Sequence, residues 1–173
     1  MSNPTGPACS GASDEAAAPL RLAIIGCGNP ARCDDGAGVE VVRALMACAP
    51  SRHGVQLIDA GTAGMDVMFR VRGAERVVIV DACKSGSEPG AIFRLPAREA
   101  MTPAQHGFTL HGLRWDHALY AGCKMFGDGF ADHAEVILIE GSEFGFGLSL
   151  SAPVQQATQQ VAQMLAASVN EHG

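Results

Sequence analysis

The chain has 173 residues, enough to bury one sizeable core, and its 47 % hydrophobic and 17 % charged residues are the proportions of an ordinary globular protein. Its net charge of −6 argues against a nucleic-acid partner, which would require a basic face. No apolar run approaches the roughly 20 residues that a membrane-spanning helix needs, so we expect no membrane partner either.

The start of the chain differs in composition from the rest. Residues 1–19 are rich in alanine, glycine, serine and proline, without the basic start or long apolar run of a targeting segment, so we predict a disordered N-terminal tail. Residues 20–170 are expected to form a single α/β domain. The six cysteines are scattered and form no CxxC pair, and together with the expected lack of an export signal this predicts a protein of the reducing cytoplasm. We expect core packing for most of them, with Cys33, beside two aspartates, as the exception.

Strand and helix patterns alternate along the domain. Short apolar runs predict strands at Leu20–Gly26, Gly54–Ala60, Arg76–Ala82 and Ala134–Glu140, with a weaker edge strand at Ala91–Leu95. Helical spacing predicts helices at Asp35–Ala49, Met65–Val71 and Leu110–Phe126, and a last helix after Ser151. The residues expected on the buried helix faces are Val39, Val42, Leu45, Met46, Trp115, Ala118, Leu119, Gly122, Val154, Ala157, Val161, Met164 and Leu165. The alternation predicts a three-layer αβα sandwich around a mostly parallel, twisted sheet. Binding residues should gather where the strand order reverses.

The loop after the first strand has two interpretations. Gly26–Ala31 matches the glycine pattern of a dinucleotide-binding turn, with Asp59 as its ribose-binding acid. However, Pro30 removes a backbone donor. Asp34 and Asp35, at the helix start, would each repel a pyrophosphate by on the order of 1 kcal/mol and suit a cation better. Capping of the helix by one of these aspartates is the structural alternative.

Two more reactive side chains are predicted at the same edge of the sheet. Asp81 ends the central strand, where a buried carboxylate is costly unless it is hydrogen-bonded or binds a metal. His111 lies at the expected start of the third helix, whose positive end would keep the imidazole neutral and able to bind a metal. His106 and His117 are competing candidates. With Asp35, these residues would form a set of two carboxylates and one imidazole, which suits a divalent first-row metal without specifying which one.

In the order and spacing of its motifs, the chain resembles the hydrogenase maturation protease family. The motifs are Gly26–Asn29 with Asp34–Val39, then Asp59–Met65, then Val80–Ala82, and finally Leu110–His111. The resemblance runs from about Leu22 to the last helix. It implies an endopeptidase that removes the C-terminal peptide of a nickel–iron hydrogenase large-subunit precursor, with nickel delivered by that precursor. The precursor would be the partner of a monomeric enzyme.

The resemblance also implies roles for individual residues. The family's metal-binding and catalytic positions fall on Asp35, Asp81 and His111, although many members have Glu at the first position. Asp59 and Thr62 would help to recognise the precursor. Whether the nickel is catalytic or only recognised, and whether Asp34 contributes, stays open. The sequence departs from the family around His111 and lacks the proline often found in Glu143–Gly147.

Two other functions remain as alternatives to the endopeptidase. One is a noncatalytic nickel-binding or docking module, and the other is a small dinucleotide-binding protein. Nucleophilic catalysis is not expected, since the chain has no G-x-S-x-G turn and no cysteine in a recognisable protease context.

Overall fold

A computed structural model describes residues 19–48, 52–103 and 113–172. In these residues five strands form one sheet in the order β2-β1-β3-β5-β4. Four strands are parallel, and β4 joins β5 as an antiparallel edge. The strands are β1 (Leu20–Cys27), β2 (Val55–Gly61), β3 (Ala74–Cys83), β4 (Ile92–Pro96) and β5 (Ala134–Glu140).

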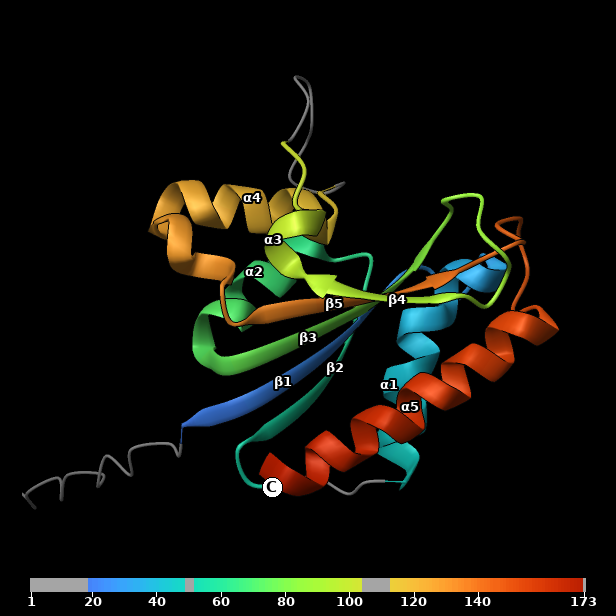
Figure 1. Cartoon of the computed structure of the whole chain (residues 1–173), viewed down its shortest axis with the longest axis horizontal. Helices are drawn as coiled ribbons and strands as arrows, with labels where there is room; N and C mark the ends of the chain where they lie inside the picture. The colour runs from blue at the N-terminus through green and yellow to red at the C-terminus, as the bar shows by residue number, and fades with distance from the viewer. Residues whose placement is uncertain (1–18, 49–51, 104–112, 173) are drawn as a thin grey trace, which may run out of the picture.

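Helices cover both faces of the sheet, as the alternating pattern predicts. The helices are η1 (Cys33–Gly36), α1 (Ala37–Cys48), α2 (Gly64–Gly73), α3 (Ala97–Ala100), α4 (Trp115–Phe126), η3 (Asp128–Ala131) and α5 (Ala152–His172). Figure 1 shows α1 and α5 on one face and α2 with α4 on the other. The three-layer α/β fold with a mostly parallel sheet is therefore confirmed.

The central strand β3 packs into two separate cores. Val77 and Ile79 face the core beneath α2 and α4, whereas Val78 and Val80 face the core beneath α1 and α5. Successive side chains of a strand point to opposite faces, so a strand covered on both sides must be apolar at every position. This is why the middle of β3, residues 77–80, is a continuous apolar run.

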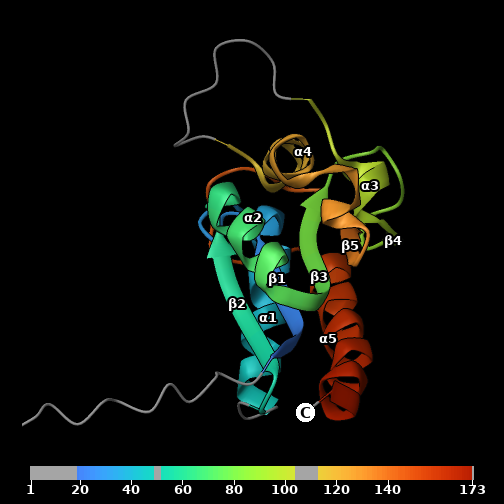
Figure 2. The ribbon, with the colours of Figure 1, turned by 90° about the vertical axis from the view of Figure 1, so that its left-hand side faces the viewer.

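The strand order reverses at β1, whose neighbours are β2 on one side and β3 on the other. The arrowheads of β2 and β3 point the same way in Figure 2, toward α4. The connections that leave β1 and β2 pass to opposite faces of the sheet, which opens a crevice at the carboxyl ends of β1 and β3. Any ligand site of this sheet is expected there.

The predicted helix starts need correction. A turn of 3-10 helix, η1, precedes α1, which begins at Ala37 rather than at Asp35. Likewise α4 begins at Trp115 and not at Leu110, since Arg114 has extended backbone angles. The short elements α3 and η3 were not expected from the sequence, because neither is long enough to show a periodic apolar pattern.

Two methionines predicted to be buried are instead exposed. Met46 is 46 % exposed and Met164 is 42 % exposed. Each is the sequence neighbour of a buried leucine, Leu45 or Leu165, and so lies about 100° around the helix from it, outside the stripe that touches the sheet. The other predicted face residues are buried.

The cysteines within the described residues are all free. Cys27 and Cys123 are buried, as expected for core packing, whereas Cys83 is half-buried and its thiol donates to Glu140 instead of packing in either core. Cys48 is exposed at the last residue of α1, so the expectation was wrong for that residue. Within the described ranges, no helix combines the length and hydropathy that crossing a membrane would require.

Candidate active site

A cavity of about 160 Å³ lies at the carboxyl ends of β1 and β3. Its walls include both aspartates that the sequence singled out, together with glycines from the two adjoining loops. The lining residues are Cys27, Gly28, Asp35, Gly61, Thr62, Gly64, Asp81, Arg114 and Trp115. The predicted convergence of Asp35 and Asp81 on one site at the sheet edge is what the structure shows.

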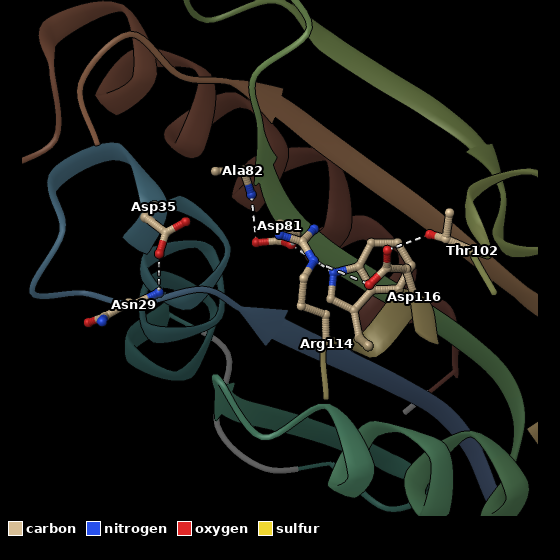
Figure 3. A network of polar contacts seen from close by, with 8 residues as sticks. Asn29, Asp35, Asp81, Ala82, Thr102, Arg114 and Asp116 are labelled. Atoms are coloured by element: carbon tan, nitrogen blue, oxygen red, sulfur yellow. Dashed lines mark hydrogen bonds and ion pairs between the residues drawn. The ribbon is translucent and has the colours of Figure 1, made fainter. Parts of the chain in front are cut away.

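Asp81 is buried at the end of β3, with 6 % of its surface exposed. The indole Nε1–H of Trp115 donates to Oδ2 at 2.7 Å, and the backbone N–H of Ala82 donates to Oδ1 at 2.8 Å. The guanidinium of Arg114 lies 3.9 Å from Oδ2 (Figure 3). Burial raises the pKa of Asp81 to about 6, although both hydrogen bonds and Arg114 act to lower it, and Asp35 adds to the rise. The side chain is therefore fixed in direction and able to change protonation near neutral pH.

Asp35 reaches the cavity from η1 through a glycine-dependent turn. Its Oδ2 accepts a hydrogen bond from the backbone N–H of Asn29 at 3.2 Å (Figure 3). Gly28 has a φ of 118°, and a Cβ added there would overlap the carbonyl oxygen of Asp35 and lie 3.4 Å from Oδ1 of Asp81. The absence of a side chain at Gly28 thus lets the loop approach the backbone of Asp35 closely. Because the backbone of Asp35 occupies this space, the turn does not support dinucleotide binding.

Asp34 has a different role from its neighbour. It is completely buried and accepts hydrogen bonds from the backbone N–H groups of Ser142, Glu143 and Ser151, and from the hydroxyls of both serines. Burial acts to raise the pKa of Asp34, but these hydrogen bonds outweigh it and hold the pKa below its usual range. Asp34 therefore ties the segment after β5 to the turn that carries Asp35.

The expectation that one of these aspartates caps the helix is wrong. The residue at the cap position of η1 is Arg32, and it makes no side-chain capping hydrogen bond. The carboxylate of Asp34 bonds to the segment after β5, and that of Asp35 bonds to Asn29, which precedes the helix. Long-range contacts have replaced the local role that cap preferences predicted.

The residues expected to recognise a precursor are close in sequence, with Asp59 near the end of β2 and Thr62 just after it, but they face different surroundings. Thr62 lines the cavity. Asp59 does not; its Oδ2 lies 3.2 Å from Nη2 of Arg43 on α1, and its Oδ1 accepts from the N–H of Gly61. Cys33 is also outside the cavity lining: its φ is 47° and its Sγ faces Gly147.

The histidine assignments are only partly covered by the structure. His111 and His106 lie outside the described residues. Nδ1 of His117 is 3.0 Å from the carbonyl oxygen of Thr102, away from the cavity lining. The helix α4 begins at Trp115, so its start does not lie at His111, and the argument that a helix start keeps His111 neutral stays a prediction.

The carboxyl groups at the cavity fit part of a divalent metal site. Among the described residues, no group of three or more His, Cys, Asp or Glu is placed to hold a metal ion. Asp35 and Asp81 supply two carboxylates to one cavity, and oxygen ligands of this kind suit a divalent cation. The third predicted ligand, His111, is not described, so the three-residue set stays a prediction.

Sequence reasoning missed Arg114 as a site residue and treated Trp115 only as packing. Arg114 lies between Asp81 and Asp116, with its Nε 3.2 Å from Oδ1 of Asp116 (Figure 3). Trp115 is 5 % exposed and gives its indole N–H to Asp81. A buried tryptophan needs an acceptor for that N–H, and the acid at the neighbouring strand end was an available signal.

An αβα sandwich that brings two carboxylates to a crevice at its strand-order reversal is typical of an α/β protein with an acidic ligand site. The sequence model of the hydrogenase maturation proteases matches residues 39–168. The chain therefore belongs to the hydrogenase maturation protease family.

Individual relatives agree with this assignment. The chain is 32 % identical over 139 residues to the hydrogenase expression/formation protein HupD of Thiocapsa roseopersicina, covering 78 % of this chain and 61 % of that protein. It is 31 % identical over 86 residues to the hydrogenase 2 maturation protease of Escherichia coli, covering 49 % of this chain and 51 % of that protein. The chain thus spans about half to three fifths of the length of these relatives.

Solved structures show the same fold. The hydrogenase maturating endopeptidase HybD of Escherichia coli superposes with a TM-score of 0.72 at 21 % identity, covering 89 % of this chain and 94 % of that one. The hydrogenase maturation protease HycI of Thermococcus kodakarensis gives a TM-score of 0.67 at 19 % identity, with 87 % and 93 % covered.

Proposed function

We propose that this protein is the endopeptidase that removes the C-terminal peptide of a nickel–iron hydrogenase large-subunit precursor once nickel has been inserted. Family membership supports the reaction type. The observation that carries the proposal is the meeting of Asp35 and Asp81 at one cavity, from the turn after β1 and the end of β3. Because both aspartates belong to one cavity of one chain, we propose that a monomer is sufficient.

Nickel belongs to the substrate in this proposal. The precursor brings the ion, and Asp35, Asp81 and His111 contact it when the precursor docks. A divalent ion next to the scissile bond would supply Lewis-acid polarisation of the carbonyl. Recognition of a loaded precursor then depends on side chains that are already positioned, since the hydrogen bonds from Trp115 and Ala82 hold the carboxylate of Asp81.

Asp81 has one of two roles, and both require its ionised form. In the first it binds the incoming ion. In the second it accepts a proton from the attacking water as a general base, for which a pKa of about 6 is well matched to neutral pH. Thr62, on the cavity wall, and Asp59, near the end of β2, are proposed to recognise the precursor.

The test is a cleavage assay with nickel-loaded and nickel-free precursor. We expect Asp35→Asn, Asp81→Asn and His111→Ala each to lower the cleavage rate by about 100-fold or more, the usual size of a lost acid–base or ligand role. Asp66→Asn is the matched control, because this aspartate lies on the surface of α2, where its carboxylate is paired with Arg70. Wild-type rates in all three site variants would rule out the assignment.

The same assay separates the endopeptidase from the docking module. A noncatalytic module would bind the loaded precursor and leave its length unchanged over any incubation time. Binding is measured by co-migration on size exclusion, and cleavage by intact mass. Binding without a mass change in the wild-type protein would replace the proposed function with docking.

A further inference from the structure

A second cavity, of about 520 Å³, adjoins the one that holds Asp81. The two share Asp35, Arg114 and Trp115 as common walls. The second cavity continues past the end of β3 toward β4 and β5, where Lys84, Leu138 and Phe144 line it. A peptide bound across this shared wall would therefore extend from the carboxylates of Asp35 and Asp81 directly into the second cavity.

The wall that carries Lys84 is held by a buried carboxylate. Glu140 is 2 % exposed and accepts hydrogen bonds from the backbone N–H groups of Ser85 and Gly86, at 2.9 and 2.8 Å. The thiol of Cys83 donates to the same carboxylate at 3.2 Å. The residues on both sides of Lys84 are thus fixed, so its backbone position is set by the fold.

The opposite wall is held in a similar way. Phe144 follows the two residues whose backbone N–H groups bond to Asp34, and its own carbonyl accepts from Nη2 of Arg32 at 2.9 Å. A Cβ added at Gly141 would meet the Phe144 ring, so the ring packs directly on that glycine. Nζ of Lys84 lies 5.9 Å from the centre of the Phe144 ring. An ammonium and an aromatic face therefore border one space.

Two charged side chains on the walls of the second cavity, Asp116 and Lys84, differ in whether they have an ion-pair partner. Asp116 is paired with Arg114 and accepts from the hydroxyl of Thr102. Lys84, by contrast, forms no ion pair with any carboxylate in the part of the chain that the structure describes; its contact there is the Phe144 ring. An exposed cation without a counter-charge, in a chain of net charge −6, is available to an acidic ligand.

We propose that this second cavity binds the precursor segment next to the scissile bond, with an apolar side chain against Phe144 and Leu138 and an aspartate or glutamate side chain paired with Lys84. The inference rests on the proposed function and names part of its substrate specificity. Because Asp35 lines both cavities, a precursor chain held at Asp35 enters the second cavity with the residues next to the cleaved bond. Lys84 acts by binding and takes no part in the chemical step.

The experiment measures kcat and KM for cleavage of the nickel-loaded precursor. Lys84→Gln is expected to raise KM about tenfold with kcat unchanged, because it removes binding that the ground and transition states share. Lys84→Arg should restore most of the wild-type KM, and Lys84→Glu should raise KM further. High salt should shrink these differences, since the pair is exposed.

The chain offers a matched control in Lys124, its only other lysine. Lys124 also lies over an aromatic ring, with Nζ 5.4 Å from the centre of Tyr120, but near the end of α4 that is remote from Trp115. Lys124→Gln should leave KM and kcat unchanged. An equal rise in KM for both lysine variants would show a general charge effect and overturn the site.

The acidic partner is found by changing each aspartate or glutamate near the scissile bond of the precursor to its amide. One such change should raise KM for the wild-type enzyme and cause no further rise with Lys84→Gln, the signature of a direct pair. If no amide change couples to Lys84, or if Lys84→Gln leaves KM unchanged while the wild type cleaves, the inference fails and the proposed function stands. If the wild type does not cleave the loaded precursor, both fail.

Discussion

The indole N–H of Trp115 donates a hydrogen bond of 2.7 Å to Oδ2 of Asp81, joining the first residue of α4 to the end of β3. Both side chains are buried, and the acceptor is the acid whose pKa burial raises to about 6. Trp115 is the only tryptophan in the chain. The intrinsic fluorescence of the protein therefore reports on the surroundings of one candidate site residue.

We predict that tryptophan fluorescence titrates with a midpoint near pH 6. Below this pH Asp81 takes up a proton and the indole loses its charged acceptor, so the emission should change as the pH falls through 6. The Asp81→Asn variant should show no such transition. A transition that persists in that variant would assign the signal to another group.

Replacing the hydrogen-bond donor should move this pKa. Trp115→Phe keeps an aromatic ring but removes the N–H, which acts to lower the pKa of Asp81. The folded-state pKa should then rise, and the acid limb of the pH profile of kcat/KM should shift to higher pH with it. The loss of a hydrogen bond to a charged group should also cost about 1.5–3 kcal/mol of stability, measured by urea unfolding. An unshifted acid limb would contradict the assignment of that limb to Asp81.

Substitution of Asp34 should lower mainly the stability of the protein, whereas substitution of Asp35 should lower mainly its activity. Asp34→Asn turns an amide N–H₂ toward backbone donors and should cost about 2–4 kcal/mol of unfolding free energy, because buried groups lose their partners. Asp35→Asn should unfold within about 1 kcal/mol of the wild type while losing cleavage, since the half-buried Asp35 accepts one hydrogen bond from Asn29. Equal unfolding free energies for the two variants would contradict the division of roles.

Glu140 should make the stability of the protein depend on pH in acid. Hydrogen bonds from the backbone of Ser85 are the largest cause of a folded-state pKa lowered to about 2, from an ordinary value of 4.5. A lowered pKa contributes stability that is complete above about 4.5 and disappears as the pH falls to about 2. Glu140→Gln should therefore lower Tm at pH 7, and the two melting curves should converge near pH 2. Glu75→Gln, at an exposed site on β3, should match the wild type throughout.

Gly28→Ala should abolish cleavage with a clear loss of stability. A Cβ at this position would overlap the carbonyl oxygen of Asp35, and a φ of 118° is unfavourable for alanine. The displaced turn would carry Asp35 away from Asp81. Gly73→Ala is the control, since a Cβ there meets nothing within 4 Å. Retained activity in Gly28→Ala, measured in the precursor assay, would show that the spacing of the two acids is not critical.

The strands and the edge that carries the site could be predicted from the sequence alone. The runs around Ile24, Ile79 and Ile137 are apolar because both faces of those strands are covered, and this burial leaves a direct mark in the sequence. Asp81 lies near the end of one such strand and Asp35 follows another, so the parallel arrangement alone places them at one edge. The sequence pattern is sufficient for these features because the burial of a strand determines its own residues.

Other properties depend on contacts between residues far apart in the chain, and only the tertiary structure decided them. Asp34 looks like a helix cap, yet its acceptor atoms bond to residues more than 100 positions away, which no local preference could indicate. The hydrogen bond from Trp115 to Asp81 and the pairing of Lys84 with Phe144 across one cavity arise in the same way. A buried carboxylate bonds to whichever donors the fold places near it, because the free-energy cost of leaving it unpaired exceeds the stabilisation that a local helix cap would provide.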